Sequence, residues 1–400
     1  MTETVESLTH LGLGKTDRDR LISGVLPGEE IEVRDDGSAR ILAPSPERVA
    51  PPCRHFKSCG GCSLQHASPD FVAQWKQGIV QKALRAHGLD VAFRPVLTSP
   101  AASRRRAKFA GRRTKKGALV GFHSKASDVI IETPDCCLVT PALQGSFEVL
   151  RDLTGIAASR KGEIALTVTE SEAGLDIVVD TNQALTPQLR ADLAILAQRY
   201  EVARLTWSDE TVVTISPPLQ TFGSSRVVPP PGAFLQATAD GEEALAQEVL
   251  RICSGADHIV DLFAGCGTFT FPLATMASVD AFEGDAEMID ALDRGWRESH
   301  GLKRVRATTR DLFRRPLEPD ELIAFDAAVI DPPRAGAAAQ IDRLVASKVP
   351  TVAMVSCNAV TFARDASLLL AGGYRMGEVL VVDQFRWSSH VEMVAAFTRP

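Results

Sequence analysis

Three side chains near the carboxyl end of the chain could carry out covalent chemistry together. Cys357 follows the apolar run TVAMVS, Asp331 precedes two prolines in VIDPPRAG, and Glu392 begins the apolar stretch EMVAAF. A thiolate can add to an electron-poor carbon, and a carboxyl group held away from water can accept a proton from carbon. The prolines fix an extended loop that holds Asp331 in a cleft, able to accept a hydrogen bond from a ring N–H. The set favours an enzyme that acts on a planar heteroaromatic ring.

A pyrimidine needs this kind of help to receive a methyl group at C5. Uracil C5 does not attack a methyl sulfonium unaided, whereas addition of the Cys357 sulfur at C6 turns the ring into an enolate that does. C5 then carries a proton that a base must remove. Glu392 and His390 are both candidates, because enclosure raises a carboxyl pKa and imidazole titrates near neutrality. A packing role is the alternative for Cys357, since buried cysteines are common.

A second group of residues, between positions 258 and 311, could bind a methyl donor. The run HIVDLFAGCGTF places a glycine turn after an apolar strand, and glycines let a ligand approach the backbone closely. Glu283 ends the next apolar run, where its carboxylate can accept hydrogen bonds from both ribose hydroxyls of an adenosine. Asp311 ends the following run, near the expected place of the adenine amino group. The GxGxxG spacing of dinucleotide enzymes is absent, which favours S-adenosylmethionine.

The pattern of apolar runs divides the chain into three predicted domains. Residues 1–48 hold short apolar stretches separated by turn signals, which predicts a small β-barrel. Residues 49–222 begin with a proline-rich linker and a predicted helix over 71–88, and then mix strand-like runs with one helical pattern, which is typical of an α+β domain. Residues 223–400 alternate strands and helices. This predicts a Rossmann-like, doubly wound α/β domain whose site lies outside the carboxyl ends of its strands.

Three of the eight cysteines have the spacing of a metal centre, CxxxxxCxxC. They are Cys53, Cys59 and Cys62. Three thiolates need a fourth ligand, which Cys136 or Cys137 can supply. Four cysteines suit either tetrahedral zinc or an iron–sulfur cluster, and a zinc site could also be completed by His55 or His66.

The distribution of charge matters more than its total. The net charge of −6 argues weakly against nucleic-acid binding, but residues 104–116, RRRAKFAGRRTKK, carry eight basic side chains and no acid. This run predicts contact with a polyanion, and a solvated hairpin is the alternative. No apolar run is long enough to span a bilayer, so no membrane association is expected. The first residues lack the features of a signal peptide, and a cytoplasmic location is expected.

Six motifs occur in a set order: CRHFKSCGGCSLQH, FLQAT, DLFAGCGTF, DPPRAG, SCN and HVEM. Together they resemble the RNA uracil-5 methyltransferases, which modify 23S ribosomal RNA and the T-loop of tRNA. The resemblance implies that Cys357 is the nucleophile and that Glu392, ahead of His390, is the proton acceptor. The implied contacts to S-adenosylmethionine are Gln236, Phe263, Thr268, Glu283 and Asp311, with Asp331 lying between cofactor and uracil.

The resemblance also bears on the cysteines and the N-terminus. It implies a structural 4Fe-4S cluster on Cys53, Cys59 and Cys62, with Cys136 as fourth ligand from the register of CCLVTPAL. The first 46 residues resemble the RNA-binding β-barrel called TRAM. Three departures from the family pattern affect fine contacts and not the reaction. They are Thr268 where asparagine is common, Ala237-Thr238 where Val-Asn is common, and Ala359 where proline usually follows SCN.

The expected reaction is therefore methylation of uracil C5 in RNA, with 23S rRNA favoured by the complete cysteine motif and the barrel-like N-terminus. The alternatives are a tRNA T-loop enzyme, a cytosine-5 methyltransferase, which uses the same thiol chemistry, and a non-catalytic RNA-binding protein. The target base must leave its stack to meet Cys357, so a flipped uracil in an RNA loop is expected, with Phe234 stacking on it.

Overall fold

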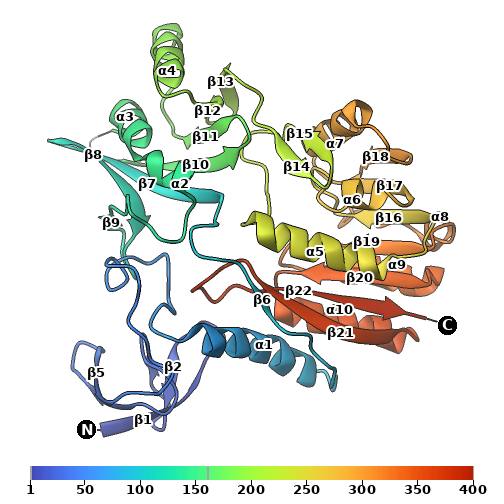
Figure 1. Ribbon diagram of the computed structural model, residues 1–400, viewed down its shortest axis with the longest axis horizontal. Coiled ribbons are helices and arrows are strands. Elements are labelled where there is room, and N and C mark those ends of the chain that lie inside the picture. Colours follow the sequence, from blue (N-terminus) through green and yellow to red (C-terminus); the bar gives the residue numbers. More distant parts are fainter. Residues whose placement is uncertain (1, 160–161, 400) are drawn as a thin grey trace.

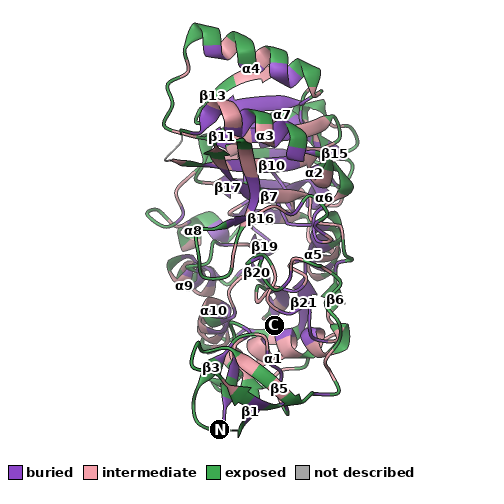
Figure 2. Ribbon diagram, turned by 90° about the vertical axis from the view of Figure 1, so that its left-hand side faces the viewer, coloured by how far each residue is buried: buried purple, intermediate pink, exposed green. Residues whose placement is uncertain are grey.

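The computed structural model describes residues 2–159 and 162–399. Figure 1 shows an N-terminal sheet at the lower left, a central sheet at the upper left and a C-terminal sheet on the right. Figure 2 shows that the strands of the two larger sheets are largely buried. Helix α4 (Pro187–Arg199), by contrast, exposes its outer side. None of the helices in this described part of the chain is long and apolar enough to cross a membrane.

The N-terminal sheet is a five-stranded half-barrel with the order β3-β2-β1-β4-β5. Its strands are β1 (Thr2–Leu8), β2 (Gly14–Thr16), β3 (Leu21–Ile22), β4 (Glu30–Val33) and β5 (Ala39–Ala43). Alternate residues of β1 and β4 face inward, so that Val5 and Ile31 pack with Ile22 and Val25 in a small core. The half-barrel agrees with the all-β unit that the N-terminal sequence predicts.

Helix α1 (Pro69–Arg85) joins this end of the chain to the C-terminal sheet. Ser68 caps it by accepting a hydrogen bond from the Phe71 amide, and Pro69 occupies the first turn. Val80 and Leu84 are buried in the core beneath the C-terminal sheet, against α10 (Ala359–Ala371). The short strand β6 (Leu97–Thr98) pairs parallel with β21 (Arg375–Asp383) at the edge of that sheet. Both elements therefore lie on the C-terminal sheet, although they precede the central sheet in sequence.

The central sheet has seven strands in the order β13-β12-β11-β10-β7-β8-β9, antiparallel except for the pair β11 and β12. Its strands are β7 (Arg106–Thr114), β8 (Gly117–His123), β9 (Ile130–Ile131), β10 (Glu163–Ser171), β11 (Gly174–Asp180), β12 (Arg204–Trp207) and β13 (Glu210–Thr214). The helices α2 (Pro141–Gly145), α3 (Phe147–Ala157) and α4 pack against it, around a core that includes Phe109 and Leu150. The hairpin of β14 (Gln220–Phe222) and β15 (Ser225–Val227) leads on to the C-terminal domain. This is the predicted α+β arrangement.

The C-terminal sheet has eight strands in the order β18-β17-β16-β19-β20-β22-β21-β6. Besides β21 and β6 its strands are β16 (His258–Leu262), β17 (Ser278–Glu283), β18 (Val305–Thr309), β19 (Ala327–Ile330), β20 (Thr351–Ser356) and β22 (Glu392–Thr398). The helices of this domain are α5 (Ala239–Ile252), α6 (Thr270–Ala274), α7 (Ala286–Glu298), α8 (Pro319–Leu322), α9 (Ala338–Ser347) and α10. Helices cover both faces, as a parallel sheet with apolar strands requires.

The strand order of this sheet reverses between β16 and β19. In doubly wound sheets a ligand binds at such a point, outside the carboxyl ends of the strands. β22 runs antiparallel to β20, so its first residue, Glu392, lies at the same edge of the sheet as the end of β20. One edge thus gathers the carboxyl ends of five neighbouring parallel strands and the start of β22.

Candidate active site

Cys357 and Glu392 lie across from each other at this edge. β20 and β22 pair with Ser356 opposite Met393, so the next position sets Cys357 beside Glu392. Glu392 is 3% exposed, whereas Cys357 keeps part of its surface open. Burial raises the pKa of Cys357 to about 11, and the charges of Glu392 and Asp331 add to the rise. Burial and the charge of Asp331 also raise the pKa of Glu392 well above its usual value. The three predicted chemical groups interact electrostatically outside the strand ends, where a doubly wound sheet has its crevice.

The half-buried Asp331 and the buried Asp261 are two interacting carboxyl groups at neighbouring strand ends. The Asp331 amide donates to the Leu262 carbonyl at 3.3 Å, which ties the loop after β19 to the end of β16. Asp261 is fully buried; its Oδ2 accepts from Thr270 Oγ1 at 2.6 Å, and its Oδ1 lacks a partner among the described residues. Burial raises the pKa of each of these aspartates to about 7, and the charge of Asp261 adds to the rise at Asp331. A cationic ligand would favour their ionised forms.

The predicted adenosine contacts also lie at strand ends. Glu283, the last residue of β17, accepts hydrogen bonds from the amides of Gly265 at 3.1 Å and Gly284 at 2.6 Å. Its carboxylate thus tightens the glycine turn after β16. Asp311 follows β18 by two residues and accepts from the Phe313 amide at 3.0 Å. Gly267 has a φ of +100°, and a Cβ there would meet the Phe271 ring at 2.4 Å, so this turn requires glycine.

The three remaining predicted cofactor residues, Phe263, Gln236 and Thr268, lie in different surroundings. Phe263 lies directly after β16 with a φ of 65°, a left-handed conformation that non-glycine residues rarely adopt. Gln236 is 3% exposed and precedes α5. Thr268 lines another cavity, of about 760 Å³, which Glu243 and Pro272 also border. The glycine loop therefore turns Thr268 toward α5.

Two residues that the sequence analysis did not single out also belong to this region. Phe313 is half exposed, and its ring centroid lies 5.4 Å from that of Phe263, so the two rings offer an apolar surface beside Asp311. Gln384 is 1% exposed and contacts Gln236. Its only sequence signal is its place directly after β21, eight residues before Glu392.

His390, the alternative base, is engaged with an arginine. Its Nδ1 lies 2.7 Å from Nη2 of Arg334, and its ring packs edge-on against Phe385. Burial lowers the pKa of His390, and the positive charges of Arg334, Lys76 and Arg104 add to the effect. His390 is therefore better placed to accept a hydrogen bond from Arg334 as a neutral imidazole, which links the DPPR loop to the last loop of the chain. It is less well placed to act as the base in the crevice.

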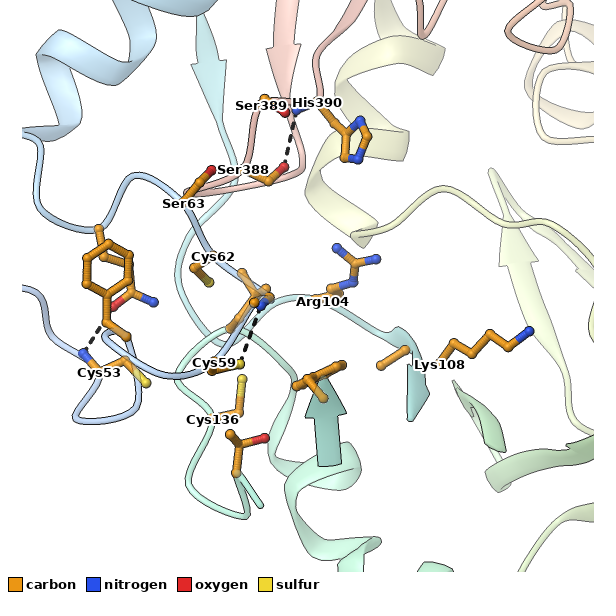
Figure 3. A pocket seen from close by; sticks show the side chains of 18 of the residues that line it. Cys53, Cys59, Cys62, Ser63, Arg104, Lys108, Cys136, Ser388, Ser389 and His390 are labelled. Carbon is orange, nitrogen blue, oxygen red and sulfur yellow. Dashed lines mark hydrogen bonds between the residues drawn. The ribbon is translucent and has the colours of Figure 1, made fainter. Parts of the chain in front are cut away.

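The predicted cysteine ligands line a single cavity of about 510 Å³ between the half-barrel, the central sheet and the last loop. Figure 3 shows the side chains of Cys53, Cys59, Cys62 and Cys136 around it, with Arg104 and Lys108 on one side. Cys137 does not line this cavity, but its thiol hydrogen-bonds to Cys53. Within residues 2–159 and 162–399, no group of three or more ligating side chains is placed to hold a single metal ion.

The histidines considered for a zinc site do not line this cavity. His55 lies 2.8 Å from Asp135 and is held in that ion pair. His66 is buried beside the Phe56 ring. Neither ring therefore adds a donor to the cysteines.

The basic segment 104–116 divides into an internal part and an exposed part. Arg105 donates to the buried carboxylate of Glu242 at 2.5 Å and to the carbonyl of Gln236 at 3.2 Å. Arg106 donates to the Gly232 carbonyl at 3.1 Å. These arginines join the central sheet to the C-terminal domain, which corrects the expectation that the whole run faces RNA. Its exposed members are Lys108, Arg113, Lys115 and Lys116.

The fold has a counterpart of known structure. The crystal structure of the Pyrococcus abyssi tRNA (uracil-54, C5)-methyltransferase in complex with S-adenosyl-L-homocysteine matches 100% of both chains, with a TM-score of 0.77 and 22% sequence identity. A family model described as tRNA (Uracil-5-)-methyltransferase matches residues 301–399, which contain Asp331, Cys357 and Glu392. The chain therefore has the fold of that methyltransferase.

Relatives in sequence extend over almost the whole chain. A protein of Brucella suis biovar 1 described as an uncharacterized RNA methyltransferase is 44% identical over 378 residues, which are 94% of this chain and 91% of that protein. The 23S rRNA (uracil(1939)-C(5))-methyltransferase RlmD of Pectobacterium atrosepticum is 32% identical over 427 residues, covering 99% of this chain and 93% of that protein. The chain belongs to the RNA uracil-5 methyltransferase family and methylates uracil C5 in RNA.

Proposed function

We propose that this enzyme methylates a uracil of 23S rRNA, with Cys357 as the nucleophile and Glu392 as the proton acceptor. The observation that carries the catalytic assignment is the strand register that sets Cys357 beside Glu392. Asp331 interacts electrostatically with both groups. A nucleophile, a base and a hydrogen-bond acceptor in one crevice are the groups that addition to C6 and proton removal from C5 require.

The reaction begins when the Cys357 sulfur bonds to uracil C6. The C5=C6 electron pair then moves toward the C4 carbonyl and forms an enolate, while Asp331 holds the ring by accepting a hydrogen bond from N3–H. The raised pKa of Cys357 keeps it a thiol in the free enzyme at neutral pH, so its proton passes to water at the open side of the sulfur as the C6–S bond forms. After C5 has been methylated, the Glu392 carboxylate takes the C5 proton. The C5=C6 bond re-forms, the C6–S bond breaks, and Cys357 is released.

The methyl group comes from S-adenosylmethionine, which supplies it on a positively charged sulfur atom. Glu283 and Asp311 would hold the adenosine, beside the apolar surface of Phe263 and Phe313. The unpartnered Oδ1 of Asp261 supports this placement, because a buried carboxylate oxygen that lacks a donor among the described residues is stabilised by a cation. Gln236 and Thr268 complete the proposed set, although Thr268 lines the cavity on the α5 side.

We further propose that Cys53, Cys59, Cys62 and Cys136 hold a 4Fe-4S cluster with a structural role. Four thiols around one cavity have the donor chemistry of such a cluster. Zinc is the less favoured occupant, since His55 is paired with Asp135 and the thiols form no single-ion site in the described residues. A cluster there would tie the segment after the half-barrel to the central sheet.

The flipped uracil needs a surface to stack on once it has left the RNA. Phe234 is 62% exposed and lies two residues before Gln236, so we assign it this role. The exposed basic residues of the segment 104–116 would contact the RNA backbone.

The choice of 23S rRNA is supported by the Pectobacterium relative, which is named for that substrate and matches 99% of this chain. Mass spectrometry of nucleosides from ribosomal and transfer RNA, fractionated separately, tests it in cells with and without the gene. We expect loss of 5-methyluridine from 23S rRNA. Loss from tRNA instead would move the target to the T-loop, and loss of 5-methylcytidine would overturn the assignment of the base.

A further inference from the structure

Gln384 occupies the junction between the proposed base and the cofactor side of the crevice. It directly follows β21, and β21 pairs with β22 so that Val382 lies opposite Glu392. Successive side chains at a strand end point to opposite faces. Asp383 accordingly meets the buried ammonium group of Lys76 on α1, while Gln384 faces the start of α5. The end of β21 is therefore held from both sides.

The amide of Gln384 has a full set of partners. Its Nε2 donates to Oε1 of Gln236 at 2.5 Å, and its Oε1 accepts from the Ala237 amide at 2.8 Å. The same side chain lies close to the carboxyl group of Glu392 and lowers its pKa, against the rise that burial causes. A primary amide offers two N–H donors and one acceptor oxygen, which matches these three partners. No other residue type of this size could serve all of them.

Close packing restricts the rotamer of Gln384. A Cβ added to Gly241, in the first turn of α5, would lie 2.6 Å from the Cβ of Gln384 and 3.2 Å from its Oε1. The absence of a side chain at Gly241 therefore allows α5 to lie directly against Gln384. A buried amide enclosed in this way holds its partners in fixed positions.

We propose that Gln384 is a positioning residue that orients the Glu392 carboxylate toward the C5 proton and ties it to Gln236 on the cofactor side. The proposal rests on the proposed catalytic role of Glu392. Its consequence is specific to one step, because Glu392 acts only after the methyl group has arrived at C5. In that step the C5 proton goes to Glu392, the C5–H electron pair forms the C5=C6 bond, and the C6–S bond to Cys357 breaks.

Loss of the Gln384 amide should therefore slow release of the methylated RNA from Cys357 more than it slows addition of Cys357 to uracil C6. In Gln384→Met the side-chain volume is kept, but Gln236, Ala237 and Glu392 each lose a partner. A hydrogen bond donated to a carboxylate favours its charged form, and burial alone opposes that form. Glu392 would then stay protonated to higher pH, and the methylated RNA would remain bound to Cys357.

The experiment is a single-turnover reaction with excess enzyme, uridine-containing RNA and methyl-labelled S-adenosylmethionine, analysed on denaturing gels. We expect the wild-type protein to show little labelled covalent complex and Gln384→Met to accumulate it, with release slowed about ten- to a hundredfold. The pH at which release reaches half its maximal rate should move upward. Gln384→Glu, which keeps the shape but replaces the N–H donors with a second carboxyl group, should move it further.

Gln340→Met is the matched control. Gln340 is also 1% exposed, and its amide exchanges two hydrogen bonds with the backbone of Leu317, away from the crevice. The Gln340→Met variant should be less stable to unfolding but should not accumulate the covalent complex. Equal slowing of addition and release in both Gln384 variants, with an unchanged pH dependence of release, would overturn the proposal. If the wild-type enzyme forms no covalent complex even with 5-fluorouridine RNA, the proposed function itself fails.

Discussion

The crevice of the C-terminal sheet and the cysteine cavity are built in different ways. Each chemical group of the crevice lies within about one residue of a strand end, so the register of the sheet determines its neighbours. The cysteines of the cavity lie on loops that are distant in sequence, with Cys62 and Cys136 separated by α1, β6, β7, β8 and β9. A site on strand ends can be anticipated from local pattern, whereas a site on loops depends on how whole domains pack.

The largest effect is expected at the crevice. Cys357→Ala should lower methylation by more than about a thousandfold, because it removes the thiol proposed to add to C6. Folding and S-adenosylmethionine binding should be retained, since Cys357 lies outside the buried core of β20. Turnover with labelled S-adenosylmethionine measures the first effect, and calorimetric titration of the cofactor measures the second. Residual turnover within tenfold of wild type would remove Cys357 from the mechanism.

The cysteine cavity offers a matched pair of neighbouring variants. Cys136 lines the cavity, whereas Cys137 lies outside it and contacts Cys53. We expect Cys136→Ser to lose most of the bound iron and sulfide after anaerobic purification, and Cys137→Ser to keep them. Metal and sulfide analysis per chain measures this. The reverse pattern would make Cys137 the fourth ligand in place of Cys136. Bound zinc without sulfide in the wild type would contradict the 4Fe-4S proposal.

Replacing Arg105 should weaken the contact between the central sheet and the C-terminal domain. Arg105 and Glu242 are about one-tenth exposed, and removing one partner of a buried pair costs about 3–5 kcal/mol. Burial already raises the pKa of Glu242, and Arg105 opposes that rise. In Arg105→Met the pKa of Glu242 therefore rises further in the folded state, so the loss of stability should grow as pH increases. Urea unfolding at several pH values tests this, with the exposed Arg113→Met as control, expected within about 0.5 kcal/mol of wild type.

The smallest effect is expected from the exposed end of the basic segment. Replacing Lys115 and Lys116 with alanine should weaken RNA binding uniformly and lower the slope of log affinity against log salt by about 1–2. Filter binding at several salt concentrations measures the slope. An unchanged slope would leave these lysines as an ordinary solvated hairpin.

Much of the fold could be predicted because strands and helices carry a local period. The alternation of residues 223–400 indicates the doubly wound sheet, and the half-barrel follows from short apolar runs between turns. The packing of α1 on α10 could not be predicted, since amphipathicity gives a buried face but not its partner. The inward orientation of the arginines and the role of Gln384 could not be predicted for the same reason. Arg105 meets Glu242, and Gln384 meets Gln236, only after distant segments have come together.

The central claim is that Cys357 bonds to uracil C6. The most direct test is to react the protein with S-adenosylmethionine and RNA that carries 5-fluorouridine. Its C5 bears fluorine in place of the proton that must be removed, so the covalent complex cannot break down. Mass spectrometry of digested peptides then locates the trapped nucleotide. We expect a fluorinated, methylated nucleotide on the peptide that contains Cys357. A nucleotide on another cysteine, or no adduct from protein that methylates uridine RNA, would contradict the account.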